Sequence, residues 1–429
     1  MHNSSFTLLK KSSLPGPDDI TRRVLENGIT LLVRPNFNTL SVSVSGYLMA
    51  GSLYEPLQKM GLADFVSSTL MRGTETHSFQ EIYSGLESIG ASLGFSGGTH
   101  TAGFSGKSLG TDLEILIGSI GEVLRQPTFP ADHVERVRSQ LLTALDLRAQ
   151  NTGEMASLAF DEIVYEGHPY QYPNEGMPDT VSAITRQDLI AFHRRHYGPK
   201  DMVIAVAGAV EPERAFQSVA KALGDWDNPE QPAVKTVPPA PALEKTTSRH
   251  YTIPDKSQTD IVLGAAGPSR SSPDFYPAKI GNSVLGQFGM MGRIGEAVRK
   301  NAGLAYYAYS SLSSSMGPGP WTVSAGVDPE DTERVIQLIV DELERFLSHP
   351  VPEEEFADSQ SSYIGKLPLA LESNAGVAGS LLNIERYQLG LDYFHRYEDM
   401  IREITPRDAH RVANTYLNLH HLAIATAGP

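Results

Sequence analysis

One pattern occurs twice along this chain, and it constrains the fold more than any other feature of the sequence. Residues 184–208 begin with Ile-Thr-Arg-Gln-Asp and end with Ile-Ala-Val-Ala-Gly, and residues 404–428 begin with Ile-Thr-Pro-Arg-Asp and end with Ile-Ala-Thr-Ala-Gly. The closing glycine follows the opening isoleucine by 24 residues in both copies (208 − 184 and 428 − 404). Each copy predicts a helix, a loop and an apolar strand. The chain is therefore predicted to contain a duplicated α+β unit of roughly 200 residues.

The predicted boundaries divide the chain into four parts. Residues 1–20 form a polar N-terminal tail, 21–225 and 250–429 are two similar α+β halves, and 226–249 is a linker. The linker contains five prolines and almost no periodicity, which is typical of a semi-rigid extended segment. A long surface loop within one domain is the alternative. Hairpin signals and alternating apolar runs indicate that each half is a largely antiparallel sheet with helices on one face.

The composition argues against several classes of function. The chain has 35 Lys and Arg against 50 Asp and Glu, a net charge of −15, which opposes binding to nucleic acids and anionic membranes. It has no cysteine, so thiol nucleophiles, thiolate metal ligands and disulfides are excluded. No apolar run approaches the roughly 20 residues needed to span a bilayer, and the first residues lack a secretory leader pattern. A soluble protein is expected, cytoplasmic unless a leader for export to the periplasm or the medium has been removed.

A motif near the N-terminus carries a family resemblance. Residues 60–74 read Met-Gly-Leu-Ala-Asp-Phe-Val-Ser-Ser-Thr-Leu-Met-Arg-Gly-Thr. They resemble the inverted zinc motif of the pitrilysin/insulinase superfamily, G-L-A-H-F-L-E-H-M-x-F-x-G-T, and the resemblance extends over about residues 21–429. In that family two histidines on one helix bind zinc, and the glutamate between them activates a water molecule. The resemblance implies a metallopeptidase LuxS-like fold for both halves.

The framework of the motif is kept, but its metal-binding residues are absent. Asp64 stands at the position of the first histidine, Ser67 at that of the glutamate and Ser68 at that of the second histidine. The third ligand of the family, a glutamate farther along the chain, falls near Ala144. One carboxylate and two hydroxyls are not expected to hold zinc at neutral pH. We therefore expect this chain to bind no metal.

A second resemblance lies in the C-terminal half. Residues 298–306 read Val-Arg-Lys-Asn-Ala-Gly-Leu-Ala-Tyr and resemble the family segment R-x-x-x-G-L-A-Y, whose Arg and Tyr face the zinc site across the cleft. Arg299 and Tyr306 match this pair in type and spacing. A guanidinium can hold a peptide carbonyl or carboxylate, and a phenol can donate to the oxyanion of a tetrahedral intermediate. Without the resemblance, they would be a solvated charge at a helix end and a strand aromatic. Tyr307 and Tyr309 are competitors, expected on the opposite strand face.

The resemblance as a whole implies a non-catalytic subunit of a heterodimeric zinc peptidase. A homologous partner subunit would carry the zinc motif, and this chain would close the peptide chamber and supply Arg299 and Tyr306 to the partner's active site. The substrate would be an extended peptide that adds a strand to a sheet edge. A purely structural or peptide-binding homologue without a peptidase role is the main alternative. A self-sufficient metallohydrolase built around Asp64 is the minor one.

Overall fold

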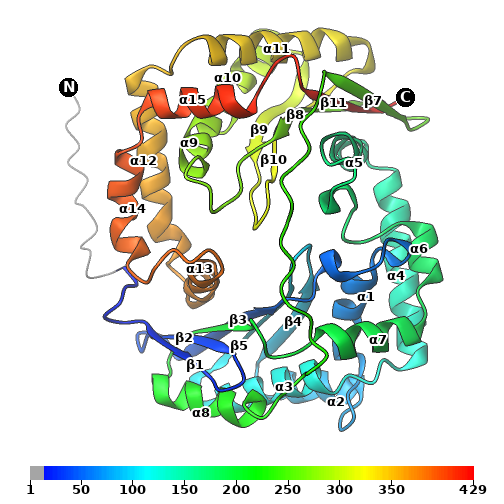
Figure 1. Ribbon diagram of the computed structural model, residues 1–429, viewed down its shortest axis with the longest axis vertical. Coiled ribbons are helices and arrows are strands. Elements are labelled where there is room, and N and C mark those ends of the chain that lie inside the picture. Colours follow the sequence, from blue (N-terminus) through cyan, green and yellow to red (C-terminus); the bar gives the residue numbers. More distant parts are fainter. Residues whose placement is uncertain (1–13) are drawn as a thin grey trace.

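Two β-sheets, one in each half of the chain, organise the computed structural model, which describes residues 14–429 (Figure 1). The first sheet has the strand order β1-β2-β6-β3-β5-β4. Its strands are β1 (Thr21–Val24), β2 (Thr30–Pro35), β3 (Ser41–Leu48), β4 (Ser92–Gly97), β5 (Ala102–Leu109) and β6 (Val203–Gly208). All neighbours in it are antiparallel except β2 and β6, which are parallel. β4 is therefore an edge strand that pairs only with β5.

The second sheet repeats this arrangement with one strand fewer. Its order is β7-β11-β8-β10-β9, and the only parallel pair in it is β7 with β11. The strands are β7 (Thr247–Thr252), β8 (Thr259–Ala266), β9 (Ala305–Leu312), β10 (Pro320–Val327) and β11 (Ala423–Gly428). Position by position, β2-β6-β3-β5-β4 corresponds to β7-β11-β8-β10-β9. The edge strand β9 therefore occupies in the second half the place of β4 in the first.

The repeated sequence pattern forms the same helix and strand in both halves. Helix α7 (Arg186–His196) and helix α15 (Pro406–Tyr416) each begin at a threonine cap, Thr185 and Thr405. In both cases the threonine side chain accepts a hydrogen bond from a backbone N–H three residues on, and the aspartate there bonds back to the threonine, which is a capping box. α7 leads to β6 and α15 leads to β11. This confirms the local structure that the repeat predicts.

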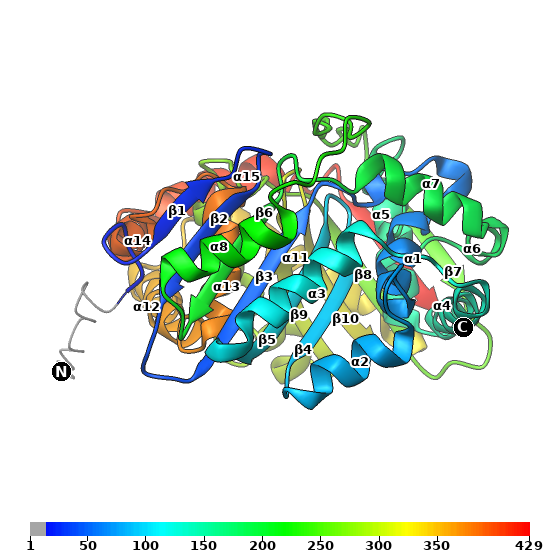
Figure 2. The same cartoon turned by 90° about the horizontal axis from the view of Figure 1, so that it is seen from below.

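The remaining helices surround the sheets. In the first half they are α1 (Leu62–Thr69), α2 (Phe79–Ser88), α3 (Leu113–Arg125), α4 (Ala131–Ala149), α5 (Thr152–Val164), α6 (Pro178–Ala183) and α8 (Pro212–Leu223). In the second half they are α9 (Phe275–Gly286), α10 (Gly292–Ile294), the π-helical turn η7 (Gly295–Asn301), α11 (Thr332–Ser348), α12 (Glu353–Ala370), α13 (Asn374–Arg386) and α14 (Tyr393–Arg402). Seen from below, α3 and α8 cover the outer face of the first sheet (Figure 2). The predicted α+β class, with two sheets packed with helices, is confirmed.

The halves exchange one helix each, which the sequence analysis does not predict. Helix α5 of the first half packs on β7, β8 and β11, and helix α13 of the second half packs on β3 and β6. Small residues allow the close approach of α5, because Ala423, Ala425 and Ala427 of β11 share one buried cluster with it. Each sheet is thus covered by helices of its own half and by one helix of the other half. The two halves form a single packed body.

The segment between α8 and β7 has no helix or strand and runs from one half to the other (Figure 1). Its beginning is fixed, because the side-chain amide of Asn228 donates to the backbone oxygens of Arg194, at 2.9 Å, and Tyr197, at 2.7 Å. The predicted tail lies outside the described residues up to position 13. Residue Leu14 contacts α14, where its backbone oxygen lies 3.3 Å from Nε2 of His395. No helix within residues 14–429 is long and apolar enough to cross a membrane.

Candidate functional site

A carboxylate fixes the N-terminus of α1, the helix that carries the degenerate motif. The helix begins after Gly61, whose φ of 93° is in the left-handed region that favours glycine. Glu55 accepts hydrogen bonds from the backbone N–H groups of Gly61, at 3.0 Å, and Ala63, at 2.9 Å. These are donors that a helix leaves free in its first turn. Burial raises the pKa of Glu55 to about 7, although the backbone donors act to lower it.

The motif positions on α1 contact other parts of the first half. Asp64 lies against β4, where the backbone N–H of Gly97 donates to its carboxylate. Burial, reinforced by the charge of Glu175, raises the pKa of Asp64 to about 6. Ser67 is buried, and its Oγ lies 3.2 Å from the phenol oxygen of Tyr197. Ser68 is half-buried. The polar atoms of Asp64 and Ser67 are therefore already engaged within the protein.

Ala144 stands on α4, which packs against α1, so the structure brings the four degenerate positions into one region. The methyl group of Ala144 has no atom that could bind a metal ion. A zinc site of this kind takes histidine, cysteine or carboxylate ligands in tetrahedral geometry. Within residues 14–429, no group of three or more His, Cys, Asp or Glu side chains could hold a metal ion. The residues at the motif positions do not fit zinc.

A cavity of about 740 Å³ opens beside Ala144, between α4, α5 and the strands β8 to β10. Most of the charged side chains that line it are acidic: Glu154, Asp161 and Glu175, compared with one basic residue, Arg148. Burial raises the pKa of Asp161 to about 7. The opposite wall holds tyrosines of β9, described below. The sequence analysis missed this acidic lining, because its residues come from distant segments and belong to no common motif.

Arg299 belongs to η7, a turn that leads from α10 toward β9. Its side chain is exposed and makes no hydrogen bond or ion pair with the described residues. Gly303, with φ of 69°, ends the helical turn, and β9 begins two residues later. Arg299 also lines a cavity of about 500 Å³ together with Phe288 and Met290, and Met290 is 75% exposed. The arginine is thus presented to solvent next to an exposed apolar loop.

Tyr306 sits on a β-bulge near the start of β9. Tyr307 pairs with Gly326 and Ala305 pairs with Val327, so Tyr306 has no partner residue on β10. A bulge breaks the strict alternation of side chains and redirects the residues at it. Tyr306 is 76% exposed, and no described residue accepts or donates a hydrogen bond at its hydroxyl. The expectation that Tyr307 and Tyr309 lie on the strand face opposite Tyr306 stays a prediction.

Tyr307 and Tyr309 instead face the acidic cavity beside Ala144. The hydroxyl of Tyr307 donates to the carboxylate of Asp260 on β8, which also receives the hydroxyl of Thr152 on α5. Asp260 is only 3% exposed, so these donors compensate a buried carboxylate. Asp260 therefore joins α5 to the second sheet through Thr152, and Tyr307 donates to the same carboxylate. Tyr307 is a structural residue, whereas Tyr306 is free.

The two groups of predicted site residues belong to different halves of the chain. Asp64, Ser67, Ser68 and Ala144 gather where α1 meets α4, beside the edge strand β4. Arg299 and Tyr306 lie where η7 leads into the other edge strand, β9. Figure 1 shows α1 in the lower half of the molecule and β9 in the upper half. Ala144 lines the acidic cavity, whose opposite wall is formed by β9, whereas Arg299 lines the cavity beside Phe288.

Comparisons with known proteins agree along nearly the whole chain. Residues 32–175 match the family described as insulinase (peptidase family M16), and residues 183–363 match the peptidase M16 inactive domain. An uncharacterized zinc protease of Mycobacterium leprae is 27% identical over 421 residues, covering 96% of this chain and 92% of that protein. The mitochondrial-processing peptidase subunit beta of Saccharomyces cerevisiae is 25% identical over 369 residues, covering 82% of this chain and 79% of the subunit.

Solved structures share the fold over a similar length. A peptidase M16 inactive domain from Pseudomonas fluorescens superposes with a TM-score of 0.87 at 27% identity, covering 96% of this chain and 98% of that one. A protease from Helicobacter pylori gives a TM-score of 0.89 at 20% identity and covers 97% of this chain and 100% of that one, which establishes likeness of fold.

Proposed function

The chain belongs to the insulinase family of peptidases, family M16, and from that membership we propose that it is the non-catalytic subunit of a heterodimeric zinc peptidase. Arg299 and Tyr306 carry this proposal. Both are exposed and unpartnered among the described residues, in a chain whose own motif lacks the donors for zinc. Both side chains are therefore accessible to a substrate or partner that comes from outside. The yeast relative, likewise, is one subunit of its peptidase.

The two side chains have distinct roles in this proposal. The guanidinium of Arg299 offers a fork of donors that holds a backbone carbonyl or carboxylate of the peptide. The phenol of Tyr306 donates to the oxygen of the scissile carbonyl as negative charge develops on it, which stabilises the transition state. Bond cleavage takes place at the partner's metal site, and this chain contributes binding and electrostatic stabilisation. The loop beside Arg299 exposes the apolar side chains of Phe288 and Met290, and in this proposal the partner covers them.

The edge strand β4 is the place for an extended substrate. It pairs only with β5, and its residues alternate between exposed and half-buried side chains. An unpaired strand edge offers N–H and C=O groups to a peptide that adds as a further strand. Asp64 and Ser68 lie beside this edge, in a helix that packs on β4. In this chain β4 would therefore guide the peptide without cleaving it.

Reconstitution tests the proposal. The chain would be co-purified with a homologous subunit that carries an intact HxxEH motif, and hydrolysis of an unstructured peptide would be measured for each subunit alone and for the complex. We expect activity only in the complex, and its loss in the Arg299→Ala, Tyr306→Phe double variant while complex formation and the partner's zinc content are unchanged. Full activity of the double variant would instead favour the structural or peptide-binding alternative.

A further inference from the structure

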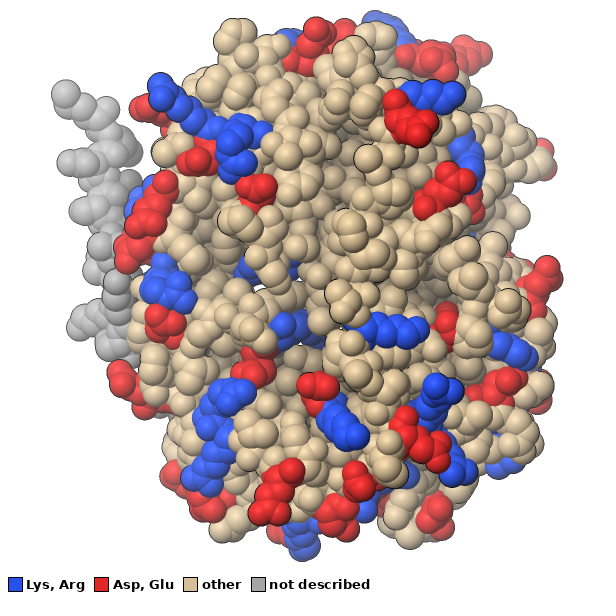
Figure 3. All heavy atoms as spheres, viewed as in Figure 1, with Lys and Arg blue, Asp and Glu red and all other residues tan. Residues whose placement is uncertain are grey.

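A second cavity, of about 610 Å³, lies entirely within the C-terminal half. It is lined by α9, α12, α13, α14 and the connection between β9 and β10, and Figure 1 shows these four helices on the left of the molecule. Three cationic side chains line it, Arg270, Lys279 and Lys366, and no described Asp or Glu does. This is unusual in a chain with a net charge of −15. On the outer face in Figure 3, by contrast, acidic and basic side chains are interspersed.

In this cavity the cationic side chains contact aromatic rings and no carboxylates. The guanidinium carbon of Arg270 lies 4.3 Å from the ring centre of Phe275 and 4.9 Å from that of Tyr276. The ammonium groups of Lys279 and Lys366 lie 5.8 Å and 5.5 Å from the ring centre of Tyr363. Cation–π contacts of this kind position a cation without neutralising it. The three cations are therefore held in place with their charges uncompensated.

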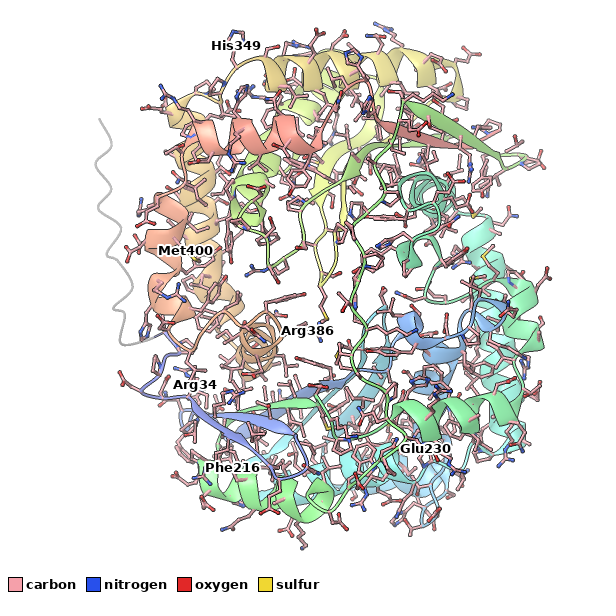
Figure 4. All side chains as sticks on the ribbon, in the orientation of Figure 1. Arg34, Phe216, Glu230, His349, Arg386 and Met400 are labelled. Carbon is pink, nitrogen blue, oxygen red and sulfur yellow. The ribbon has the colours of Figure 1, made fainter. Side chains whose placement is uncertain are left out.

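No ion pair relieves the repulsion between these cations within residues 14–429. Burial lowers the pKa of Lys279, and the charges of Arg270 and Lys366 lower it further. Arg270 donates one nitrogen, Nη2, to the hydroxyls of Tyr276, at 2.8 Å, and Tyr393, at 3.3 Å, which leaves its other donors free. Arg386 of α13, labelled in Figure 4, does not line this cavity, because its guanidinium carbon lies 4.2 Å from the ring centre of Tyr47 on β3. An entering anion would satisfy donors that the protein leaves unused.

The shape and lining specify the anion further. The volume exceeds what a single small oxyanion needs and falls in the range of ligand pockets, about 300–1,000 Å³. Tyr387, Phe394 and Tyr397 add aromatic surface around the cations. We propose that this cavity binds the C-terminal end of a peptide, with the carboxylate on Lys279 and Lys366 and the last side chains against the tyrosine rings. The identification of the ligand as a peptide rests on the proposed function, but the anion site itself does not.

Direct binding to the isolated chain tests this proposal. The probe is an N-terminally labelled, unstructured peptide in two forms, one with a free C-terminal carboxylate and one amidated, with Kd measured by fluorescence anisotropy at low salt. We expect the carboxylate form to bind about tenfold more tightly or better, because a hydrogen bond to a charged group is stronger than one between neutral groups. Equal binding of the two forms by the wild type would overturn the proposal.

Variants locate the site. Lys279→Met and Lys366→Met keep an unbranched apolar side chain and remove the charge. The double variant should lose the preference for the carboxylate peptide. The single variant Lys366→Met, at an exposed position, should reduce this preference. Lys107→Met, an exposed change of the same kind on β5, should leave the preference intact. Thermal unfolding confirms that each variant is folded. If the folded double variant still prefers the carboxylate peptide, the carboxylate binds elsewhere. The same follows if folded Lys366→Met keeps the full wild-type preference.

Competition with inorganic phosphate tests whether the site takes a peptide carboxylate or free phosphate. If phosphate displaces the carboxylate peptide from the wild type, the two share the site as proposed. If phosphate binds and the carboxylate peptide does not, the peptide assignment is wrong. Because no partner subunit is present in these measurements, their failure would leave the roles of Arg299 and Tyr306 untouched. Failure of the reconstitution would likewise leave the anion site standing.

Discussion

Helix α1 and the turn η7 each pack on the edge strand of their own sheet, β4 and β9, yet the polar groups of the two regions are used in opposite ways. Around α1, Glu55 accepts backbone donors and Ser67 contacts Tyr197, so the polar atoms are satisfied within the fold. In η7 and β9, Arg299 and Tyr306 remain in solvent. Satisfied internal groups contribute to stability, whereas exposed ones contribute only when a ligand or partner arrives. The difference predicts that mutations in the first region change stability and mutations in the second change activity.

The largest expected effect is on catalysis by the assembled complex. Tyr306→Phe removes one donor to the developing oxyanion and should lower kcat by about 100- to 1,000-fold, or about 3–4 kcal/mol. Arg299→Ala should also raise KM if the guanidinium holds the peptide in the ground state. Steady-state kinetics of the reconstituted heterodimer measure both. Tyr309→Phe is the matched control, since its hydroxyl makes no hydrogen bond with the described residues; Tyr307→Phe is unsuitable because its hydroxyl bonds to Asp260.

Mutations around α1 should instead change the stability of the protein. Glu55→Ala removes the acceptor for two backbone N–H groups at the start of α1, and the free energy of unfolding should fall by about 2–3 kcal/mol. Denaturant unfolding of the isolated chain measures this change. Arg299→Ala, an exposed substitution, should stay within about 0.5 kcal/mol of the wild type. Equal losses in the two variants would remove the contrast between the regions.

The pH dependence of stability sharpens the same contrast at Asp64. An acid whose pKa is higher in the folded than in the unfolded state costs stability as pH rises from the lower to the higher value. Asp64 has a pKa of about 6 in the folded protein against an ordinary 3.8. Asp64→Asn should therefore raise the free energy of unfolding at pH 8 by at most about 3 kcal/mol and change it little at pH 4. Unfolding curves at both pH values check this, and a loss of stability at pH 8 would contradict it.

The smallest effect is expected where the chain is cut between the halves. Limited proteolysis should cleave within residues 233–246, which have no helix or strand, before it cleaves the helices. The fragments should nevertheless elute together, because α5 and α13 are each packed on the sheet of the other half. Size-exclusion chromatography of the nicked protein measures this. Separation of the fragments without denaturant would show that the exchanged helices contribute little.

The sequence by itself determined the features that depend on local pattern. The copies at 184–208 and 404–428 specify a capped helix followed by an apolar strand, because capping residues and hydrophobic periodicity act within a few turns of chain. The sequence alone also shows that Asp64, Ser67, Ser68 and Ala144 replace the metal ligands, because the residue type decides which donor atoms a side chain has.

Tertiary structure alone decided the exchange of α5 and α13, the bulge at Tyr306, the bond between Tyr307 and Asp260 and the cavity around Lys279. Each of these depends on pairing between segments tens to hundreds of residues apart. The register of β9 on β10 fixes where the extra residue falls, and strand alternation in the sequence gives no sign of it. Likewise, Arg270, Lys279 and Lys366 are ordinary isolated charges along the chain. They become one uncompensated cluster only because α9, α12 and the connection between β8 and α9, which carry them, line the same space.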